Sequence, residues 1–344
     1  MNNENADSTL VIDLGAIKSN YEKIKNLSPN AITGAVVKAD AYGLGVEPVS
    51  KKLQSAGCKD FFVATLDEAV ELRGILPSEN IYVFHGVGEG QEPVFLDKNL
   101  IPVLNTSSQV ERWNNVKGEK PPAILHFDTG INRLGLNMSE AEGLNISNIE
   151  IKYIMSHLAC AATPENPKNK EQLENFNKIK ASFPDVPATL CNSGGVLLGE
   201  DYHFDLTRPG ISLYASGVVT LKSKIIQVRE VESAGAAGYG ATYEVKAGSK
   251  LAVVPVGYAD GYMRSLSNNS FAYIGDIKVP IAGIVSMDMI ILDVSDAGDV
   301  NIGDEVELIG DNFTVDMMAD MAKTISYEVL TGLGSRYKRV YLNG

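Results

Sequence analysis

The chain has 344 residues, of which 44% are hydrophobic and 21% charged, as is usual for a globular protein with a substantial core. Its 30 lysines and arginines against 43 aspartates and glutamates give a formal net charge of −13. Because such a surface on average repels a nucleic-acid backbone or an anionic membrane, the charge argues against both partners. At ~150 residues per domain, the length predicts about two domains.

The chain shows none of the usual signs of export or membrane insertion. No stretch approaches the ~20 apolar residues that span a bilayer. The first residues, MNNENADSTLVIDLG, lack the basic segment followed by an apolar one that marks a secretory signal. Three cysteines, far apart at positions 58, 160 and 191, do not make a disulfide framework. We therefore expect a cytoplasmic protein.

Strand-like and helix-like segments alternate through the first two thirds of the chain. An early strand, TLVID, and a helix, GAIKSNYEKIKNL, come first, and we expect this strand to belong with the second domain. Eight apolar runs follow, separated by segments such as LDEAVELRGIL, in which apolar residues recur every three or four positions. The runs cover 32–38, 61–65, 81–85, 101–104, 123–128, 151–157, 188–192 and 204–208.

Continuous apolar strands separated by helices predict a parallel sheet that is buried on both faces. Eight such units favour a closed (β/α) barrel of the TIM type, and an open doubly wound sheet fits the same pattern. We assign residues 1–216 to this α/β domain.

After Arg208 the pattern changes to that of a mainly β domain, residues 217–344. Strand-like segments such as KIIQVREV, SKLAVVPVGYAD and DEVELIG are separated by Gly, Asn and Asp turns. Helical stretches are expected only near TVDMMADMAKTIS and YEVLTGLG, before a last strand, RYKRVYL.

The carboxyl ends of the eight runs carry most of the candidate functional groups. In a parallel barrel these ends form one open face, where functional side chains collect. They hold Lys38, His85, Asp128, His157, Asn192 with Ser193, and Arg208, and Arg133 follows in the loop after the fifth run. A lysine flanked by buried backbone has a lowered pKa and suits Schiff-base chemistry, although a lysine reaching past the strand into solvent fits the same position.

Gly-rich turns add two possible anion sites. DTGINRLG (128–135) carries Arg133, whose planar fork suits a carboxylate, although the spacing alone favours a surface arginine in a helix-entry loop. NSGG (192–195) and RPGIS (208–212) place small residues at late strand-to-helix turns, where free backbone N–H groups favour a phosphate. The histidines at 85, 126, 157 and 203 lack zinc-ligand spacing, so we expect no metal.

Taken together, these stretches resemble the alanine racemase family, fold type III enzymes that use pyridoxal 5'-phosphate. The resemblance runs in order through nearly the whole chain. Its motifs are VVKADAYGLG, FFVATLDEAVELR, DTGINRLG, MSHLACA, NSGG, HFDLTRPGISLY, GYGATYEV, VGYADGY, GIVSMDMI and YEVLTGLGSRY.

The resemblance implies a role for each matching residue. Lys38 would hold the cofactor as a Schiff base, and Tyr243, from the partner subunit, would be the second catalytic base. Arg208 would face the pyridine nitrogen with support from His157, and Arg133 would lie near the substrate carboxylate. The cofactor phosphate would be held by Tyr42, Ser193, Gly210, Ile211 and Tyr327. Met287 would help to bind the carboxylate with Asp288 beside it, and Tyr258 and Tyr327 would narrow the entrance.

The implied activity is the interconversion of L- and D-alanine by two-base proton transfer, which supplies D-alanine for peptidoglycan. Lys38 would serve one face of the α-carbon and Tyr243 the other. Since Tyr243 and Met287 would complete the partner's site, we expect a homodimer with composite active sites. The Tyr243 phenol would then need a pKa well below ~10, set by nearby cations.

Three positions depart from the family pattern: His126, Ala162 in place of an acidic residue, and Ile131 in place of the commoner methionine. Only His126 bears on the chemistry. Many relatives carry a lysine two residues before the Asp-Thr-Gly, modified to a carbamate that braces the arginine, whereas this chain has His126. What orients Arg133 is therefore open: His126 itself, or another anion.

Three other functions fit parts of the sequence. A basic amino-acid decarboxylase would carry a carboxylate where Arg208 stands. A non-catalytic pyridoxal-phosphate-binding protein would be a bare barrel without the β domain. A racemase of broader specificity, acting on serine, would usually be exported; we rank it below alanine.

Overall fold

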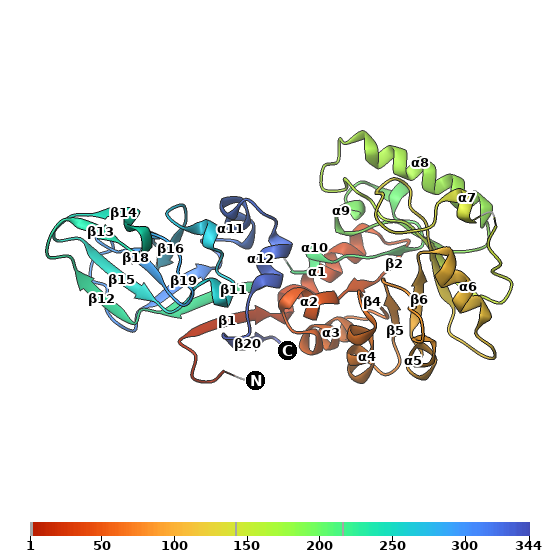
Figure 1. Cartoon of the computed structure of the whole chain (residues 1–344), viewed down its shortest axis with the longest axis horizontal. Helices are drawn as coiled ribbons and strands as arrows, with labels where there is room; N and C mark the ends of the chain where they lie inside the picture. The colour runs from red at the N-terminus through yellow and green to blue at the C-terminus, as the bar shows by residue number, and fades with distance from the viewer. Residues whose placement is uncertain (1–2, 142, 215–216) are drawn as a thin grey trace. The chain divides into compact units, whose positions relative to one another are not determined.

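The protein is described by a computed structural model covering residues 3–141, 143–214 and 217–344. The chain forms two compact units, a β/α unit (Lys18–Ala41 and Gly45–Leu213) and a β-rich unit (Met1–Ile17, Tyr42–Leu44 and Tyr214–Gly344). The expected boundary at residue 216 lies outside the described residues. Figure 1 labels the elements of each unit.

The β/α unit is built around parallel strands that alternate with helices. A seven-stranded sheet runs in chain order from β3 to β9. Its strands are β3 (Ala35–Val36), β4 (Asp60–Val63), β5 (Asn80–Val83), β6 (Ile101–Leu104), β7 (Ala123–His126), β8 (Ile151–Met155) and β9 (Ala188–Thr189). These strands are almost wholly buried, as their unbroken apolar sequences predict.

The eighth predicted strand, β10, joins the two ends of this sheet. β10 (Leu206–Thr207) pairs in parallel with β2 (Ile32–Thr33), which Gly34 separates from β3. On its other side, the N–H groups of Asp205 and Arg208 donate to the carbonyls of Ala188 and Cys191, at 3.0 and 2.9 Å. The predicted barrel-type architecture is confirmed, although the eighth run pairs with β2 in a separate ladder instead of extending the seven-stranded sheet.

Helices follow most of the strands and cover the sheet. They are α1 (Leu14–Leu27), α2 (Lys38–Gly43), α3 (Val46–Ser55), α4 (Leu66–Ile75), α5 (Glu92–Asp97), α6 (Ser107–Asn115), α7 (Met138–Ala141), α8 (Pro167–Ser182), α9 (Ser193–Val196) and α10 (Ile211–Tyr214). Local sequence sets their ends: Thr65 and Glu68 form a capping box on α4, and Asn166 caps α8 with Pro167 in its first turn.

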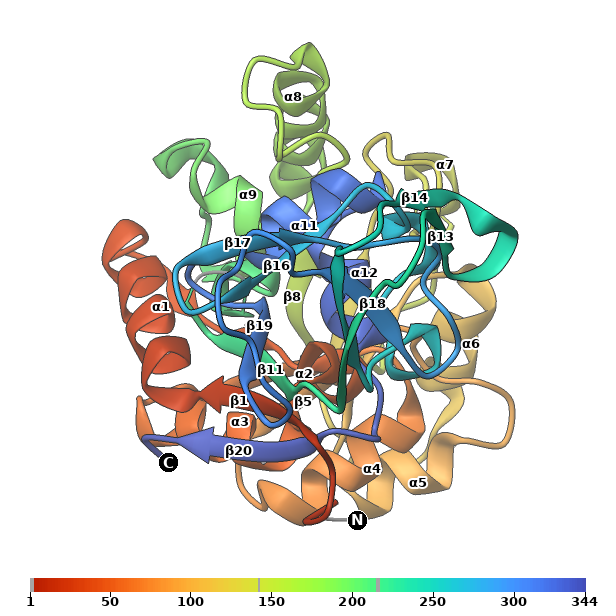
Figure 2. The same ribbon diagram turned by 90° about the vertical axis from the view of Figure 1, so that its left-hand side faces the viewer.

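The β-rich unit holds a six-stranded sheet in the order β17-β16-β19-β11-β1-β20. These strands are β1 (Ser8–Asp13), β11 (Val219–Lys224), β16 (Phe271–Ile274), β17 (Ile277–Pro280), β19 (Glu305–Ile309) and β20 (Lys338–Leu342). The early strand β1 pairs antiparallel with β11 and parallel with β20, and Figure 2 shows β1 beside β20.

Two smaller sheets and two helices complete this unit. β15 (Lys250–Val254) lies between β12 (Gln227–Glu230) and β18 (Ile290–Asp293), and β13 (Gly235–Ala237) forms a hairpin with β14 (Tyr243–Val245). The helices α11 (Val315–Ala322) and α12 (Ser326–Gly332) contact each other.

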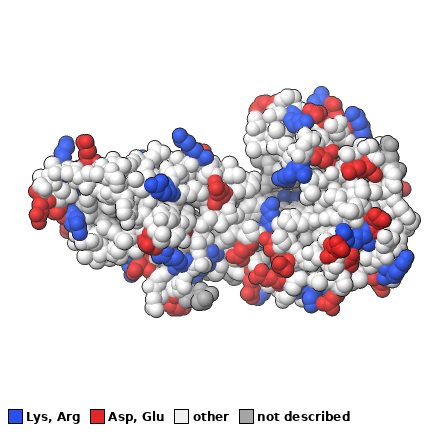
Figure 3. Space-filling view, viewed as in Figure 1, with Lys and Arg blue, Asp and Glu red and all other residues white. Residues whose placement is uncertain are grey.

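The surface mixes both signs of charge. On the face drawn in Figure 3, lysines and arginines are interspersed with acidic residues over each unit. Within the described residues, none of the helices is both long enough and apolar enough to cross a bilayer.

Candidate active site

Lys38 stands where the first barrel strand ends and α2 begins. The side chain is half-buried, with its Nζ 5.9 Å from the centre of the Phe84 ring. Burial lowers the pKa of Lys38, the positive charge of Arg133 lowers it further, and Glu68 opposes both. A lowered pKa leaves more of the amine neutral, which is the form that attacks a carbonyl.

The turn after Lys38 has an unusual backbone. Ala39, Asp40, Ala41 and Tyr42 all have φ between 52° and 59°, so α2 is a left-handed turn of four consecutive non-glycine residues. Such a conformation costs roughly 1–2 kcal/mol per residue. The turn is held in place by Glu68, which accepts from the Ala39 N–H at 2.8 Å, and by Asp40, whose carboxylate accepts from the Val46 N–H at 2.6 Å.

The end of this turn packs within the β-rich unit. The Tyr42 ring lies 4.7 Å from that of Tyr214 and 6.0 Å from that of Tyr327, between ring centres. Burial raises the pKa of Tyr42 and of Tyr327, so both phenols stay protonated and can donate a hydrogen bond. At Gly43, any Cβ would lie 2.6 Å from the carbonyl oxygen of Leu330, which requires glycine.

Arg208 is fully buried after β10 and bonds only neutral acceptors among the described residues. Its Nη2 donates to the carbonyls of Ser156 and Leu190, at 2.7 and 3.2 Å, and its Nη1 donates to the Thr189 hydroxyl. Burial lowers the pKa of Arg208 to about 10, so the guanidinium is still charged at neutral pH.

His157 lies at the end of β8 and is half-buried. Burial lowers the pKa of its imidazole well below the usual value, and the positive charges of Arg208 and Arg133 lower it further. The ring is therefore neutral at neutral pH.

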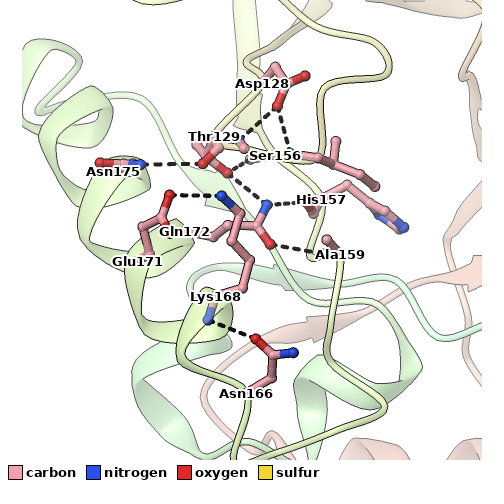
Figure 4. Close-up of polar contacts among 12 residues, drawn as sticks. Asp128, Thr129, Ser156, His157, Ala159, Asn166, Lys168, Glu171, Gln172 and Asn175 are labelled. Carbon is pink, nitrogen blue, oxygen red and sulfur yellow. Dashed lines mark hydrogen bonds and ion pairs between the residues drawn. The ribbon is translucent and has the colours of Figure 1, made fainter.

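Helix α8 braces the backbone at this histidine and just after it, as Figure 4 shows. The Gln172 amide donates to the His157 carbonyl at 2.9 Å and accepts from the Ala159 N–H at 2.8 Å. The same amide donates to the Thr129 hydroxyl, which is 2.7 Å from that of Ser156. One fully buried side chain thus ties the loop after β7 to the loop after β8. Sequence reasoning passed over Gln172, because no local pattern marks it.

Ser193, Gly210 and Ile211 come together as predicted for adjoining turns. The Ser193 hydroxyl accepts from the N–H of Gly210 at 2.9 Å and from that of Ser212 at 3.2 Å, and the Ser212 hydroxyl lies 3.0 Å away. Ile211 begins α10 between these donors. Ser212 was not singled out from the sequence, although it closes the RPGIS motif. This group of hydroxyls and backbone N–H groups is chemically suited to phosphate oxygens.

Asp128 shapes the loop that carries Arg133. Its carboxylate accepts from the N–H groups of Gly130, Ile131 and Arg133, at 2.8, 2.9 and 3.0 Å. Burial alone would raise the pKa of Asp128, but these backbone bonds outweigh it and the pKa is lowered. The Arg133 side chain is exposed. Lys38, Arg133 and Arg208 form no ion pair with any acidic side chain among the described residues.

The GYGATY turn of the β-rich unit holds two tyrosines in different surroundings. Tyr243 begins β14, and its hydroxyl donates to the Asp293 carboxylate at 3.0 Å. Burial and this carboxylate raise the pKa of Tyr243 to about 12, opposite to what a base at neutral pH needs. Tyr239, which sequence reasoning passed over, is 72% exposed four residues earlier. The position of Tyr239 in the same GYGATY motif was the sequence feature that could have identified it as a candidate.

Tyr258 and Met287 lie on adjoining segments of the β-rich unit. The N–H groups of Tyr258 and Ala259 donate to the carbonyls of Ser286 and Met287, each at 3.0 Å. This approach requires Gly257, because a Cβ there would lie 2.3 Å from the Met287 carbonyl oxygen. Asp288 forms an ion pair with Arg336 at 2.9 Å.

The described residues hold no group of three or more His, Cys, Asp or Glu side chains placed to bind a metal ion. Three basic side chains of the β/α unit follow the carboxyl ends of strands, which parallel pairing brings to one edge. The basic side chains of Lys38, Arg133 and the buried Arg208 favour the binding of an anion at this edge.

The comparisons agree with this arrangement. The family models for the N-terminal and C-terminal domains of alanine racemase match residues 12–217 and 218–341. The biosynthetic alanine racemase of Agrobacterium fabrum is 43% identical over 370 residues, covering 98% of this chain and 95% of the relative. The alanine racemase of Rickettsia canadensis is 45% identical over 349 residues, covering 97% and 98%.

Solved structures give the same result. Alanine racemase from Bartonella henselae, with covalently bound pyridoxal phosphate, superimposes with a TM-score of 0.94 at 37% identity, covering 97% of this chain and 99% of that one. The biosynthetic enzyme of Pseudomonas aeruginosa gives 0.89 at 32% identity, with the same coverage. Similarity of this extent, in sequence and in structure, shows that the chain belongs to the alanine racemase family.

Proposed function

We propose that this protein interconverts L- and D-alanine with pyridoxal 5'-phosphate, as a source of D-alanine for peptidoglycan. One observation carries the proposal: a half-buried lysine of lowered pKa shares the carboxyl edge of the barrel with two arginines that lack acidic partners among the described residues. Such an edge attracts an anionic aldehyde and an amino-acid carboxylate.

The residues present fit pyridoxal phosphate. The hydroxyls of Ser193 and Ser212 and the N–H of Gly210, beside Ile211, suit its phosphate. The sequence also assigns Tyr42 and Tyr327 to this role, and their protonated phenols can donate a hydrogen bond. When bound, the cofactor supplies an aldehyde for an amine and a ring that accepts negative charge from the substrate α-carbon. Arg208 would hold the ring nitrogen of the cofactor, and its guanidinium does not readily give up a proton.

In the proposed reaction, two bases move a proton between opposite faces of the α-carbon. The Lys38 amine serves one face. Arg133 holds the substrate carboxylate, with the backbone of Met287 and Asp288 beside it, and His157 supports Arg208 from the neighbouring strand. Tyr258 and Tyr327 narrow the entrance.

A tyrosine of the GYGATY turn serves the other face. Tyr243 is the sequence prediction, but its hydroxyl is bonded to Asp293 and its pKa is raised to about 12. Tyr239 is exposed, and the phenol is free to enter a second site. These contacts favour Tyr239 as the base, with Tyr243 fixing the turn through Asp293.

We infer that the site is completed by a second copy of the chain. Exposed apolar side chains in the β-rich unit support this inference: Tyr239, Tyr258 at 43% exposure, Met287 at 53% and Met289 at 45%. Clustered apolar exposure of this kind marks interaction surfaces. We place the enzyme in the cytoplasm, and its three free cysteines, two of them buried, are consistent with a reducing compartment.

The deciding experiment combines spectroscopy with chiral analysis. The purified protein should show a visible absorbance that borohydride removes, with the added mass on the peptide containing Lys38. L-alanine should be converted to the racemate, and L-serine much more slowly. Lys38→Ala should lose both the absorbance and the turnover, whereas Lys170→Ala, at an exposed lysine of α8, should keep both.

Each alternative function has its own outcome in this experiment. Equal turnover of serine and alanine would indicate a racemase of broader specificity. Bound cofactor without turnover of either would indicate a non-catalytic pyridoxal-phosphate-binding protein. Absorbance that survives in Lys38→Ala would remove Lys38 from its proposed role.

A further inference from the structure

Two complementary groups near the barrel edge lack partners. His126, on β7, is 5% exposed, and its Nε2 is buried with no hydrogen-bond partner in the described part of the chain. The guanidinium of Arg133, seven residues later, is exposed and makes no hydrogen bond or ion pair with the described residues. A buried acceptor or donor left unpaired costs ~1–3 kcal/mol, so the buried Nε2 atom of His126 calls for a partner.

Asn105 decides which nitrogen of His126 carries the proton. The Asn105 Nδ2 donates to the carbonyls of Phe84 and Val103, at 2.9 and 2.8 Å, which fixes the orientation of the amide. Its Oδ1 therefore faces His126 Nδ1, at 2.7 Å. An amide oxygen can only accept, so Nδ1 is the donor and Nε2 presents a lone pair.

His126 also remains neutral. Burial is the main cause that lowers the pKa of His126 to about 3, and the charges of Arg208 and Arg133 add to it. At neutral pH, Nε2 is thus an acceptor. The lone pair of the neutral ring repels an anion and attracts a hydrogen-bond donor. A donor is therefore the complementary partner for Nε2.

We propose that His126 Nε2 accepts a hydrogen bond from the Arg133 guanidinium and so orients it toward the substrate carboxylate. Arg133 is the donor that fits, because Asp128 fixes its loop through the Arg133 N–H and its guanidinium has no other described partner. This inference rests on the proposed function only for the role of Arg133. His126 is accordingly a positioning residue, and Asn105 sets its tautomer.

A neutral brace has a chemical consequence. A carboxylate or carbamate beside Arg133 would offset much of its charge, whereas an imidazole lone pair orients the guanidinium and leaves the full positive charge for the substrate. The racemase should therefore show no requirement for bicarbonate or chloride.

Steady-state kinetics test the proposal through a double-mutant cycle. His126→Leu removes the acceptor at similar volume and should raise the KM for alanine about tenfold, as expected for one lost hydrogen bond to a charged group, with kcat changed less. His126→Gln keeps an acceptor and should stay within about twofold of wild type. In an Arg133→Lys background, His126→Leu should have almost no further effect, because its partner is already altered. Equal effects in both backgrounds would overturn the proposal.

A second measurement does not depend on activity. In protein labelled with ¹⁵N-histidine, the signals missing from His126→Gln identify the His126 ring. They should show a protonated Nδ1 and an unprotonated Nε2 from pH 5.5 to 8, and Arg133→Lys should shift the Nε2 signal alone. A proton on Nε2 would contradict the assignment, and so would an Nε2 chemical shift that is unchanged in Arg133→Lys.

The two readouts separate this inference from the proposed function. If the wild-type protein neither binds the cofactor nor racemises alanine, the proposed function fails while the spectra still report on the contact between His126 and Arg133. If the enzyme is active and the cycle is additive, only the positioning role of His126 fails.

Discussion

Tyr239 and Tyr243 lie four residues apart and differ in their surroundings: Tyr239 is exposed, whereas the Tyr243 hydroxyl donates to the Asp293 carboxylate. Tyr239→Phe should reduce turnover by roughly 10²–10⁴-fold, the usual contribution of a general base, and should slow proton exchange from L-alanine more than from D-alanine. Tyr243→Phe removes only the bond to Asp293 and should cost less than about tenfold. Chiral turnover and solvent deuterium incorporation measure both. The opposite ranking would restore Tyr243 as the base.

Because His126 is buried in its neutral form, the free energy of unfolding depends on pH. The folded-state pKa of His126 is about 3, below the ordinary value of 6.5, so the unfolded chain binds the proton more readily. This contribution to stability is complete above about pH 6.5 and is lost as the pH falls toward 3.

Replacing His126 by glutamine, which does not titrate, should flatten this loss. The slope of the unfolding free energy between pH 4.5 and 6.5 should decrease by up to about 1.4 kcal/mol per pH unit. Urea unfolding across this range measures it, with His85→Gln, at an exposed histidine, as the control. An unchanged slope in His126→Gln would show that His126 is not held neutral.

The sequence predicted where candidate residues lie when chain direction alone decides their position. Lys38, His157 and Arg208 follow parallel strands, whose carboxyl ends meet at one edge, so strand ends were enough to group them. The hydrogen-bond partners of Tyr243 and His126 could not be predicted from the sequence. Asp293 is 50 residues from Tyr243, and Asn105 is 21 from His126. Contacts made through tertiary packing leave no local pattern.

At the scale of elements, α8 connects chain segments that the sequence shows only as separate loops. Gln172→Leu keeps the volume but leaves the Ala159 N–H and the His157 carbonyl unpaired, which should destabilise the fold by roughly 2–6 kcal/mol at ~1–3 kcal/mol per group. The KM for alanine should also rise, because the loop of Thr129 carries Arg133. Glu174→Gln, exposed on the same helix, is the control. A urea midpoint unchanged in Gln172→Leu would rule out the brace.

Element types were easier to predict than element geometry. The apolar runs predicted the buried strands, and the apolar periodicity of LDEAVELRGIL predicted the helix α4, since both depend on local sequence. The left-handed turn of α2 was not predicted. KADAY consists of ordinary residues, and only packing around Glu68, Asp40 and Gly43 holds it in that conformation.

For the whole molecule, the barrel-type architecture was predictable because eight run-and-helix repeats leave few topologies. Pairing of β1 with β11 and β20 joins segments more than 200 residues apart, which periodicity alone does not encode. The arrangement of two chains is likewise a proposal that needs its own test.

Subunit mixing provides that test. In a composite site, one chain supplies Lys38 and the other supplies the base. Lys38→Ala and Tyr239→Phe should each be nearly inactive alone. After subunit exchange, the mixed dimers regain one intact site each, so activity should return to roughly a quarter of wild type. A mixture that stays inactive after exchange is verified would place both bases on a single chain.

The left-handed turn beside Lys38 also limits how this enzyme can be redesigned. Side chains branched at Cβ clash with the backbone when φ is positive, so Ala39 and Ala41 are closed to valine, isoleucine and threonine. Glycine and, less readily, asparagine are the natural replacements there. Active variants selected from a library randomised over this segment should therefore carry few residue types, mostly glycine. This holds even at Ala39, which is exposed and which solvent accessibility alone would suggest is free to vary.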